Sequence, residues 1–258
     1  MFPAPFPPGG WDDIRAMKLA PVHVAVLDSG VDASHPDLAG RMLGAFSVGM
    51  EDGKPKVQEC PAGANNDMFG HGTPVAGIIA AIAPNAMIYD IRVFNQHTAG
   101  ATQVLLAGLE HALGLDVKIL NLSLAVVLSI KHEMMELCER AYFEQKIIVA
   151  ARRNAPFEDE GLPAELSSCI GVDRGEYPSP FHYSFRRGVP IEFEARGEKV
   201  VAPAPGGGYT TLSGTSFATP TMVGLCALLL GAYPGMTLFE IKTALRQLSQ
   251  VIPEESQV

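Results

Sequence analysis

The sequence predicts one α/β domain with a mainly parallel central sheet that is covered by helices on both faces. Short β-branched or aliphatic runs alternate with longer helical patterns, which is typical of βαβ units. Runs such as VAVL and KIIVA are apolar throughout or nearly so, as strands buried on both faces are. The 258 residues are 47% hydrophobic and 18% charged, which is enough to bury one large core.

The expected elements follow in chain order from these patterns. Aliphatic runs predict strands at residues 23–27, 87–94, 118–122, 146–150 and 169–172. Longer patterns with helical spacing predict helices at residues 71–82, 102–113, 130–143, 216–233 and 237–248. Between residues 175 and 214 the helical period disappears and Gly and Pro become frequent, which predicts loops and antiparallel strands.

The domain is expected to span residues 1–258, with an N-terminal segment at 1–20 and a polar tail at 249–258. Trp11 and Ile14 are expected to pack the N-terminal segment onto the body. No basic region followed by an apolar stretch opens the chain, so no secretory signal is expected. No apolar run approaches the roughly 18 to 20 residues of a spanning helix, and the longest lies at 224–232.

Charge and cysteine usage narrow the function classes. A formal net charge of −9 disfavours binding to nucleic acid or to an anionic membrane. The four cysteines show neither a CxxC pair nor metal-ligand spacing, and Cys226 lies in an apolar helical run where a buried thiol is expected. A soluble protein of the reducing cytoplasm fits these observations.

Asp28, His71 and Ser216 stand where strands or loops meet helices. In open α/β sheets, such positions converge at the carboxyl ends of the strands. A serine hydroxyl needs an adjacent base to become a nucleophile, and the base needs a group that orients it. Alone, each of these residues is more often a cap or a turn residue, but their chain order Asp, His, Ser is the order of subtilisin.

Three long motifs stand in chain order: VAVLDSGVDASHPDL at 24–38, HGTPVAGIIAA at 71–81 and SGTSFATPTMVGLCALLL at 213–230. They look like the three catalytic blocks of the subtilisin-like serine proteases, which the sequence resembles over roughly residues 11–248. KILNLSL resembles its substrate-flanking strand, IIVAARRN its oxyanion-hole strand, and IRVFNQHTAG the strand and substrate-binding loop that contains Gly100.

The resemblance implies a three-layer fold and a role for each matching residue. Asp28 corresponds to the orienting carboxylate, His71 to the general base and acid, and Ser216 to the nucleophile. Asn154 corresponds to the side chain that stabilises the oxyanion, together with the backbone N–H of Ser216. The positions expected to bind substrate are Gly100, Ser123, Leu124, Ala125, Val126, Arg152, Arg153 and Thr215.

The chain departs from the family pattern at several of these positions. Pro74 stands where a second His is usual, which costs little in the first turn of a helix. Ala125 and Val126 replace two glycines, so a narrower S1 pocket is expected. Arg152 and Arg153 replace Ala-Gly, and two fates remain open for them. Both face solvent or pair internally, or Arg153 points into S1 and selects an acidic P1 residue.

Two features expected of many secreted relatives are missing. The insertion that carries a strong calcium site is absent, and Asp37 alone remains where that site's carboxylate would be. We therefore expect no calcium at that position, assign no metal ligand and expect no cofactor, while weak cation sites elsewhere stay open. No inhibitory pro-domain of several dozen residues is recognisable ahead of the Asp28 block, so restraint by narrow specificity, by a regulatory partner or by a pocket that is closed at rest is expected.

The leading hypothesis is a serine endopeptidase that hydrolyses protein or peptide substrates through an acyl-enzyme. A transpeptidase or macrocyclase of peptide maturation is one alternative, in which an amine replaces water at the acyl-enzyme. A catalytically silent binding module, with Arg153 and Val126 blocking the cleft, is the other.

Overall fold

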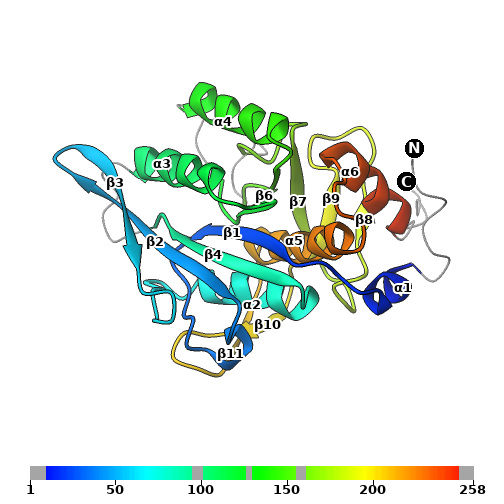
Figure 1. Cartoon of the computed structure of the whole chain (residues 1–258). Coiled ribbons are helices and arrows are strands. Elements are labelled where there is room, and N and C mark those ends of the chain that lie inside the picture. Colours follow the sequence, from blue (N-terminus) through cyan, green and yellow to red (C-terminus); the bar gives the residue numbers. More distant parts are fainter. Residues whose placement is uncertain (1–9, 95–100, 126–129, 155–160, 250–258) are drawn as a thin grey trace.

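The structure, a computed structural model, describes residues 10–94, 101–125, 130–154 and 161–249. A central sheet runs through the molecule with helices on either side, which confirms the expected α/β class (Figure 1). The helices are α1 (Trp11–Ala16), α2 (Gly72–Ile82), α3 (Ala101–Gly114), α4 (Lys131–Phe143), α5 (Thr215–Ala232) and α6 (Leu238–Leu248), with a 3-10 turn η1 (Pro36–Leu38).

The main sheet has nine strands in the order β3-β2-β4-β1-β5-β6-β7-β9-β8. They are β1 (Val22–Asp28), β2 (Met42–Glu51), β3 (Lys54–Cys60), β4 (Ala86–Arg92), β5 (Ile119–Leu122), β6 (Ile147–Ala151), β7 (Cys169–Gly175), β8 (Ser184–Phe185) and β9 (Phe193–Arg196). The strands from β2 to β9 in this order pair in parallel, and only β3 and β8 join the edges antiparallel. A separate hairpin is formed by β10 (Val200–Pro203) and β11 (Tyr209–Leu212).

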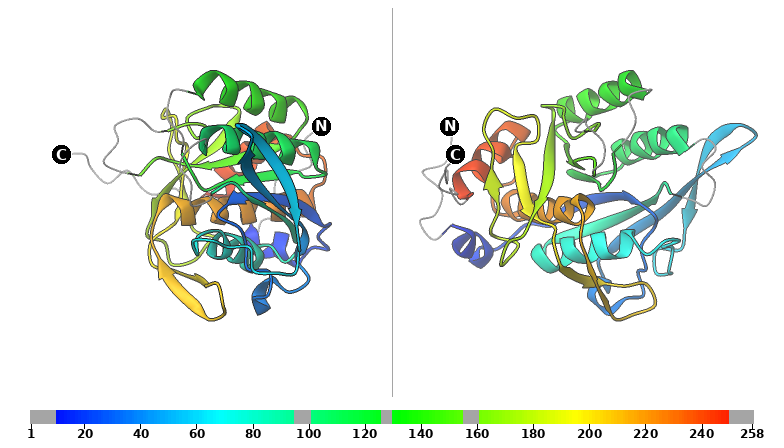
Figure 2. Two further views of the ribbon diagram at one scale, coloured as in Figure 1. Left: turned by 90° about the vertical axis from the view of Figure 1, so that its left-hand side faces the viewer. Right: turned by 180° about the vertical axis from the view of Figure 1, so that it is seen from behind.

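Each face of the sheet has its own core because side chains alternate along a strand. Val24 and Val26 of β1 face α2 and α5, whereas Ala25 and Leu27 face α3 and α4. The rotated views show these helix pairs on opposite sides of the sheet (Figure 2). Polar residues at the carboxyl ends of the central strands therefore lie near the first turns of α2 and α5.

The hairpin of β2 and β3 extends beyond the body of the molecule and was not among the predicted strands (Figure 1). Its turn is Asp52-Gly53, and both residues have positive φ, 50° and 74°. This Asp-Gly pair is a strong sequence signal for a hairpin. The strands escaped prediction because their side chains are mostly exposed or only partly buried and show no aliphatic run.

The N-terminal segment packs as expected. Trp11 is 8% exposed and Ile14 is fully buried, and the Trp11 ring lies 6.2 Å from Phe181 and 6.3 Å from Tyr183. Cys226 is also fully buried, as predicted for a small apolar side chain in α5. All four cysteines are free thiols.

Helix α5 differs from the expectation that no apolar stretch approaches the length of a membrane-spanning helix. It has 18 residues and a mean hydropathy of 1.5, so by length and composition it matches a membrane-crossing helix. Its threonines and Pro220 interrupt the apolar letters, so the unbroken apolar run at 224–232 is shorter than the helix itself, which was expected at 216–233. Because 89% of it is buried inside the protein, it has the position of a core helix.

Candidate active site

Asp28 and His71 form the centre of the site. Asp28 ends β1 and its side chain is fully buried, whereas His71 caps α2 and its side chain is 31% exposed. Nδ1 of His71 lies 2.7 Å from Oδ1 of Asp28. A proton held on Nδ1 by this carboxylate leaves Nε2 free to act as a base.

The environment raises the pKa of His71. Burial on its own would lower this pKa, but the hydrogen bond and charge of Asp28, together with the charge of Asp67, outweigh it. The imidazolium form is therefore stabilised relative to a free histidine. A base that is about to receive a proton needs that property.

Two glycines bring His71 against Asp28. A Cβ on Gly72 would lie 2.2 Å from the carbonyl oxygen of Gly30, so the start of α2 touches the turn after β1. Gly30 has φ +99°, and a Cβ there would lie 2.0 Å from the carbonyl oxygen of Asn66. Any larger side chain at either position would separate the two segments that carry the pair.

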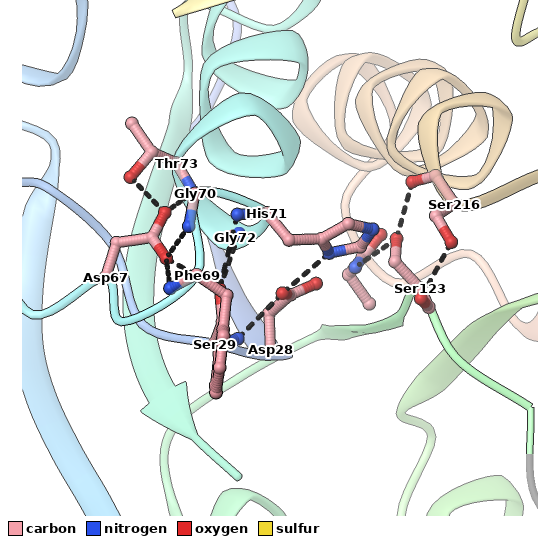
Figure 3. A network of polar contacts seen from close by, with 11 residues as sticks. Asp28, Ser29, Asp67, Phe69, Gly70, His71, Gly72, Thr73, Ser123 and Ser216 are labelled. Carbon is pink, nitrogen blue, oxygen red and sulfur yellow. Dashed lines mark hydrogen bonds and ion pairs between the residues drawn. The ribbon is translucent and has the colours of Figure 1, made fainter. Parts of the chain in front are cut away.

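Asp67 organises the loop that leads into His71 (Figure 3). Its carboxylate accepts hydrogen bonds from the hydroxyls of Ser29 and Thr73 and from the backbone N–H groups of Phe69, Gly70 and Thr73. Burial would raise the pKa of Asp67, but these hydrogen bonds lower it overall. The hydroxyl of Ser29 also accepts from the N–H of Gly72 at 3.0 Å, which ties the Asp28 turn to α2.

Ser216 lies in the first turn of α5, next to Ser123 at the end of β5. Its hydroxyl donates to the Ser123 carbonyl at 3.0 Å, and the Ser123 hydroxyl donates to the Ser216 carbonyl at 2.9 Å. Pro220 lacks the N–H that would normally bond the Ser216 carbonyl four residues earlier, so this carbonyl is open to Ser123.

The His71 ring lies between Asp28 and the Ser123–Ser216 pair in Figure 3. In the part of the chain that the structure describes, no hydrogen bond joins His71 to Ser216. The ring of Phe217, the next residue of α5, lies 5.2 Å from the His71 ring. The three residues predicted to carry the chemistry thus meet at one site, with the Ser216 hydroxyl directed to Ser123.

Asn154 lies three residues beyond the end of β6 and is exposed. Its Oδ1 lies 3.2 Å from the hydroxyl of Thr215, which also donates to the carbonyl of Arg152 at 2.8 Å. With Oδ1 engaged in this way, the Nδ2 amide is the end of Asn154 left to donate. Ser216 is the second residue of α5, so its backbone N–H has no partner within the helix.

A cavity of about 320 Å³ opens beside Ser216. It is lined by Leu124, Ala125, Ala151, Arg152, Arg153, Asn154, Thr215 and Ser216. Gly161, with φ +84°, packs closely against two residues of this wall, because a Cβ there would lie 2.9 Å from the Cβ atoms of Ala125 and Arg153. The volume is at the small end of ligand pockets, which span about 300 to 1,000 Å³.

Arg152, one of the two arginines of this wall, forms an ion pair within the protein. Arg152 pairs with Asp173 at 2.8 Å, and Arg186 contacts the same carboxylate oxygen at 2.9 Å. Burial would raise the pKa of Asp173, but the N–H of Arg174 and both guanidinium groups lower it. Arg152 thus has the internal pairing that was one of its two expected fates, and Arg153 lines the cavity.

Most of the expected substrate-binding residues gather around Ser216. Ser123 contacts it directly, and Leu124, Ala125, Arg152, Arg153 and Thr215 line the cavity. Gly100 and Val126 lie outside the described residues. Asp37 is held by the hydroxyl of Tyr209, 3.0 Å from both carboxylate oxygens. Within residues 10–94, 101–125, 130–154 and 161–249, no group of three His, Cys, Asp or Glu residues is placed to hold a metal ion.

Sequence reasoning missed two carboxylates at this site, Asp67 and Asp90. Asp67 stands four residues before His71, where it reads as an ordinary loop residue. Asp90 interrupts the apolar strand IYDIRVF, and a charge inside a strand buried on both faces was a signal that could have found it.

Sequence comparisons place these residues in a known context. A family model described as "Subtilase family" matches residues 20–253. The "Intracellular serine protease" of Paenibacillus polymyxa is 32% identical over 240 residues, covering 86% of this chain and 69% of the relative. "Subtilisin DY" of Bacillus licheniformis is 30% identical over 249 residues, covering 91% and 86%. "Thermitase" of Thermoactinomyces vulgaris is 29% identical over 258 residues, covering 95% and 86%.

Solved structures share the fold. One titled "S41 Psychrophilic Protease" superposes with a TM-score of 0.70 at 24% identity, covering 88% of this chain and 82% of its own. Fervidolysin from Fervidobacterium pennivorans gives a TM-score of 0.70 at 23% identity, covering 89% of this chain and 39% of its own. The predicted three-layer subtilisin-like fold is therefore confirmed.

Proposed function

The chain belongs to the subtilase family of serine proteases, and from this membership we propose that it is an endopeptidase with Asp28, His71 and Ser216 as its catalytic residues. The observation that carries the proposal is the 2.7 Å contact between His71 Nδ1 and Asp28 Oδ1, close to the first turn of α5 that contains Ser216. It supplies an oriented base next to a serine, the combination that acyl transfer needs.

Catalysis begins when the Ser216 hydroxyl leaves the Ser123 carbonyl and donates to Nε2 of His71. As Nε2 takes the proton, Oγ attacks the carbonyl carbon of the substrate and the carbonyl oxygen becomes an oxyanion. Collapse of this intermediate expels the amine, which takes the proton from His71, and leaves an acyl-enzyme. Water then repeats the sequence and releases the acid. Asp28 stays ionised and stabilises the imidazolium.

Asn154 and the backbone N–H of Ser216 donate to the oxyanion in this proposal. The Thr215 hydroxyl beside Oδ1 supports this role for Asn154, since it leaves Nδ2 to donate toward Ser216. Donors held in place before the reaction stabilise the developing charge without reorganising.

The specificity proposed here is narrow, with an acidic side chain in the cavity beside Ser216. The cavity is small, and Ala125 and Arg153 form part of its wall. Arg152 and Arg153 both line the cavity, and the guanidinium of Arg153 is the group we assign to the substrate carboxylate. Proteins or peptides are the proposed substrates.

A fluorophosphonate probe and cleavage-site mapping test the function together. The probe should label the wild-type protein and not Ser216→Ala, and a complex peptide mixture should show new termini only with the wild type. Product masses that increase by one water per cut identify hydrolysis, whereas ligated products would identify a transpeptidase. Absence of both labelling and cleavage would contradict the proposed function.

A further inference from the structure

A second carboxyl group, that of Asp90, is buried next to the Asp28 pair. Asp90 lies on β4, where it is 1% exposed and paired with Val26 of β1. Asp28 pairs with Arg92 two residues further along, so Asp28, Val26, Asp90 and Arg92 share one face of the sheet. Asp90 therefore lies diagonally across from Asp28, on the neighbouring strand and near the same end of the sheet.

Asp90 holds the turn that follows Asp28. Its Oδ2 accepts a hydrogen bond from the N–H of Val31 at 3.1 Å, while its Oδ1 is buried without a hydrogen-bond partner. The Val31 carbonyl in turn accepts from the N–H of Asn66 at 3.0 Å. Through Val31, Asp90 is linked to both the turn after Asp28 and the loop that leads to His71.

Arg92 attaches the same loop to β4 from the next position on this face. Its guanidinium donates to the Asn66 carbonyl at 3.2 Å and to the Ser47 hydroxyl at 2.9 and 3.2 Å. Neighbouring side chains of one strand thus hold both segments that carry the catalytic pair. A mere space-filling residue at position 90 would leave the Val31 N–H buried without this acceptor.

The charges around Asp90 are few and all belong to this region. Arg92 faces it from its own strand, Asp28 from β1 and Asp67 from the loop before α2, while β2 places uncharged Ala45 opposite. Burial raises the pKa of Asp90 to about 7, and the two other carboxylates add to the rise against the Val31 N–H and Arg92. Asp28 likewise has a buried oxygen, Oδ2, without a partner.

We propose that Asp90 is a positioning residue for the catalytic pair: it holds the Asp28 turn through Val31, and its ionisation adds to the basicity that Asp28 and Asp67 give His71. This inference rests on the proposed role of His71 as the base. A negative charge at Asp90 stabilises the imidazolium, so His71 keeps its proton to higher pH when Asp90 is ionised. Loss of the charge therefore moves the acid limb of activity to lower pH.

The decisive experiment titrates His71 by NMR and requires no turnover. The imidazole signals are followed from pH 4 to 9 in Ser216→Ala and in Ser216→Ala/Asp90→Asn, with His71→Gln identifying the resonance. The asparagine amide keeps an oxygen for the Val31 N–H but carries no charge. The expected result is a pKa of His71 lower by about half a unit to one unit in the double variant.

Kinetics on enzyme that keeps Ser216 test the charge of Asp90 and its hydrogen bond to Val31 separately. Asp90→Asn should shift the acid limb of kcat/KM to lower pH and keep the plateau within about threefold, while Asp90→Ala should lower the plateau by about tenfold or more, since one buried donor is left unpaired. Ile88→Val, a core change on the same strand, controls for lost stability and should leave the pH profile in place.

Two results would overturn the inference. One is an unchanged pKa of His71 in the Asp90→Asn background, with melting showing that the protein is folded. The other is an equal plateau for Asp90→Asn and Asp90→Ala. If the enzyme proves inactive on every peptide, the proposed function fails, but the NMR titration still decides the role of Asp90.

Discussion

The hydroxyls of Ser216 and Ser123 each donate to the other residue's backbone carbonyl, at 3.0 and 2.9 Å. This reciprocal pair links the first turn of α5 to the end of β5. It also occupies the hydroxyl that the proposed mechanism uses, so activation requires its rotation toward His71. Pro220 favours this arrangement. Because proline has no backbone N–H, the Ser216 carbonyl would lack a helical donor, and the Ser123 hydroxyl takes that place.

Ser216→Ala should abolish peptide hydrolysis, with kcat falling by on the order of 10⁵- to 10⁶-fold, because no other group can form the acyl-enzyme. The measurement is turnover of a peptide found by cleavage-site mapping. Ser167→Ala, at an exposed serine that is not among the residues lining the cavity, is the matched control and should retain activity. Full activity in Ser216→Ala would remove Ser216 from the mechanism.

Asn154→Ala should lower kcat by about 100- to 1000-fold and change KM little, because the lost donor acts on the oxyanion and not on bound substrate. Steady-state kinetics separate the two constants. Thr215→Val should have a smaller effect in the same direction, since Thr215 acts by orienting Asn154. A variant whose KM alone changes would assign Asn154 to substrate binding.

Arg153→Gln should reduce kcat/KM for substrates with Asp or Glu at P1 by about tenfold or more, since a charge-assisted pair with the substrate is lost. Substrates with an apolar P1 residue should be affected much less. A peptide library with varied P1, read with wild type and variant, gives both numbers. A wild-type preference for large apolar P1 residues, indifferent to Asp and Glu, contradicts the acidic pocket.

Asp90→Asn should raise the free energy of unfolding above that of the wild type, and this gain should be larger at pH 8 than at pH 4. The pKa of Asp90 rises from 3.8 to about 7 on folding, so the folded chain binds more protons than the unfolded chain between these values. The stability that Asp90 contributes is fully present below pH 4 and is lost as pH rises to about 7. Asparagine has no such loss, so the variant should gain a few kcal/mol over the wild type between pH 4 and pH 8.

Denaturant unfolding at several pH values measures this change. Asp12→Asn is the control, because the side chain of Asp12 is 91% exposed and a change there should alter the pH dependence little. A difference between Asp90→Asn and wild type that stays constant from pH 4 to pH 8 would show that the carboxyl group is not strained by burial.

Chelation should leave thermal stability within about 2 °C of the untreated protein. Asp37, where the resemblance led us to look for a calcium ligand, accepts the Tyr209 hydroxyl with both oxygens. Differential scanning calorimetry with and without EDTA makes the comparison. A melting temperature lowered by many degrees would reveal a cation that contributes to stability.

The periodicity and the local motifs were sufficient to predict the central elements and to name the groups that meet at the candidate site. Helix α2 was expected at 71–82 and begins at Gly72 with His71 as its cap, and α6 begins at Leu238 after its Thr237 cap. These boundaries follow from apolar spacing and capping residues, which act within a few neighbours along the chain. The exposed hairpin of β2 and β3 lacked that apolar signal.

Contacts across the fold depend on which distant segments meet, and no local pattern encodes that. Asp173 pairs with Arg152 across two strands, Ser123 meets Ser216 from 93 positions away, and Asp90 is buried against Val31. The sequence was enough to name a hydroxyl, an imidazole and a carboxylate. Their partners, protonation and resting geometry arise only when packing removes water and brings distant charges together, because burial and proximity shift both hydrogen bonding and pKa.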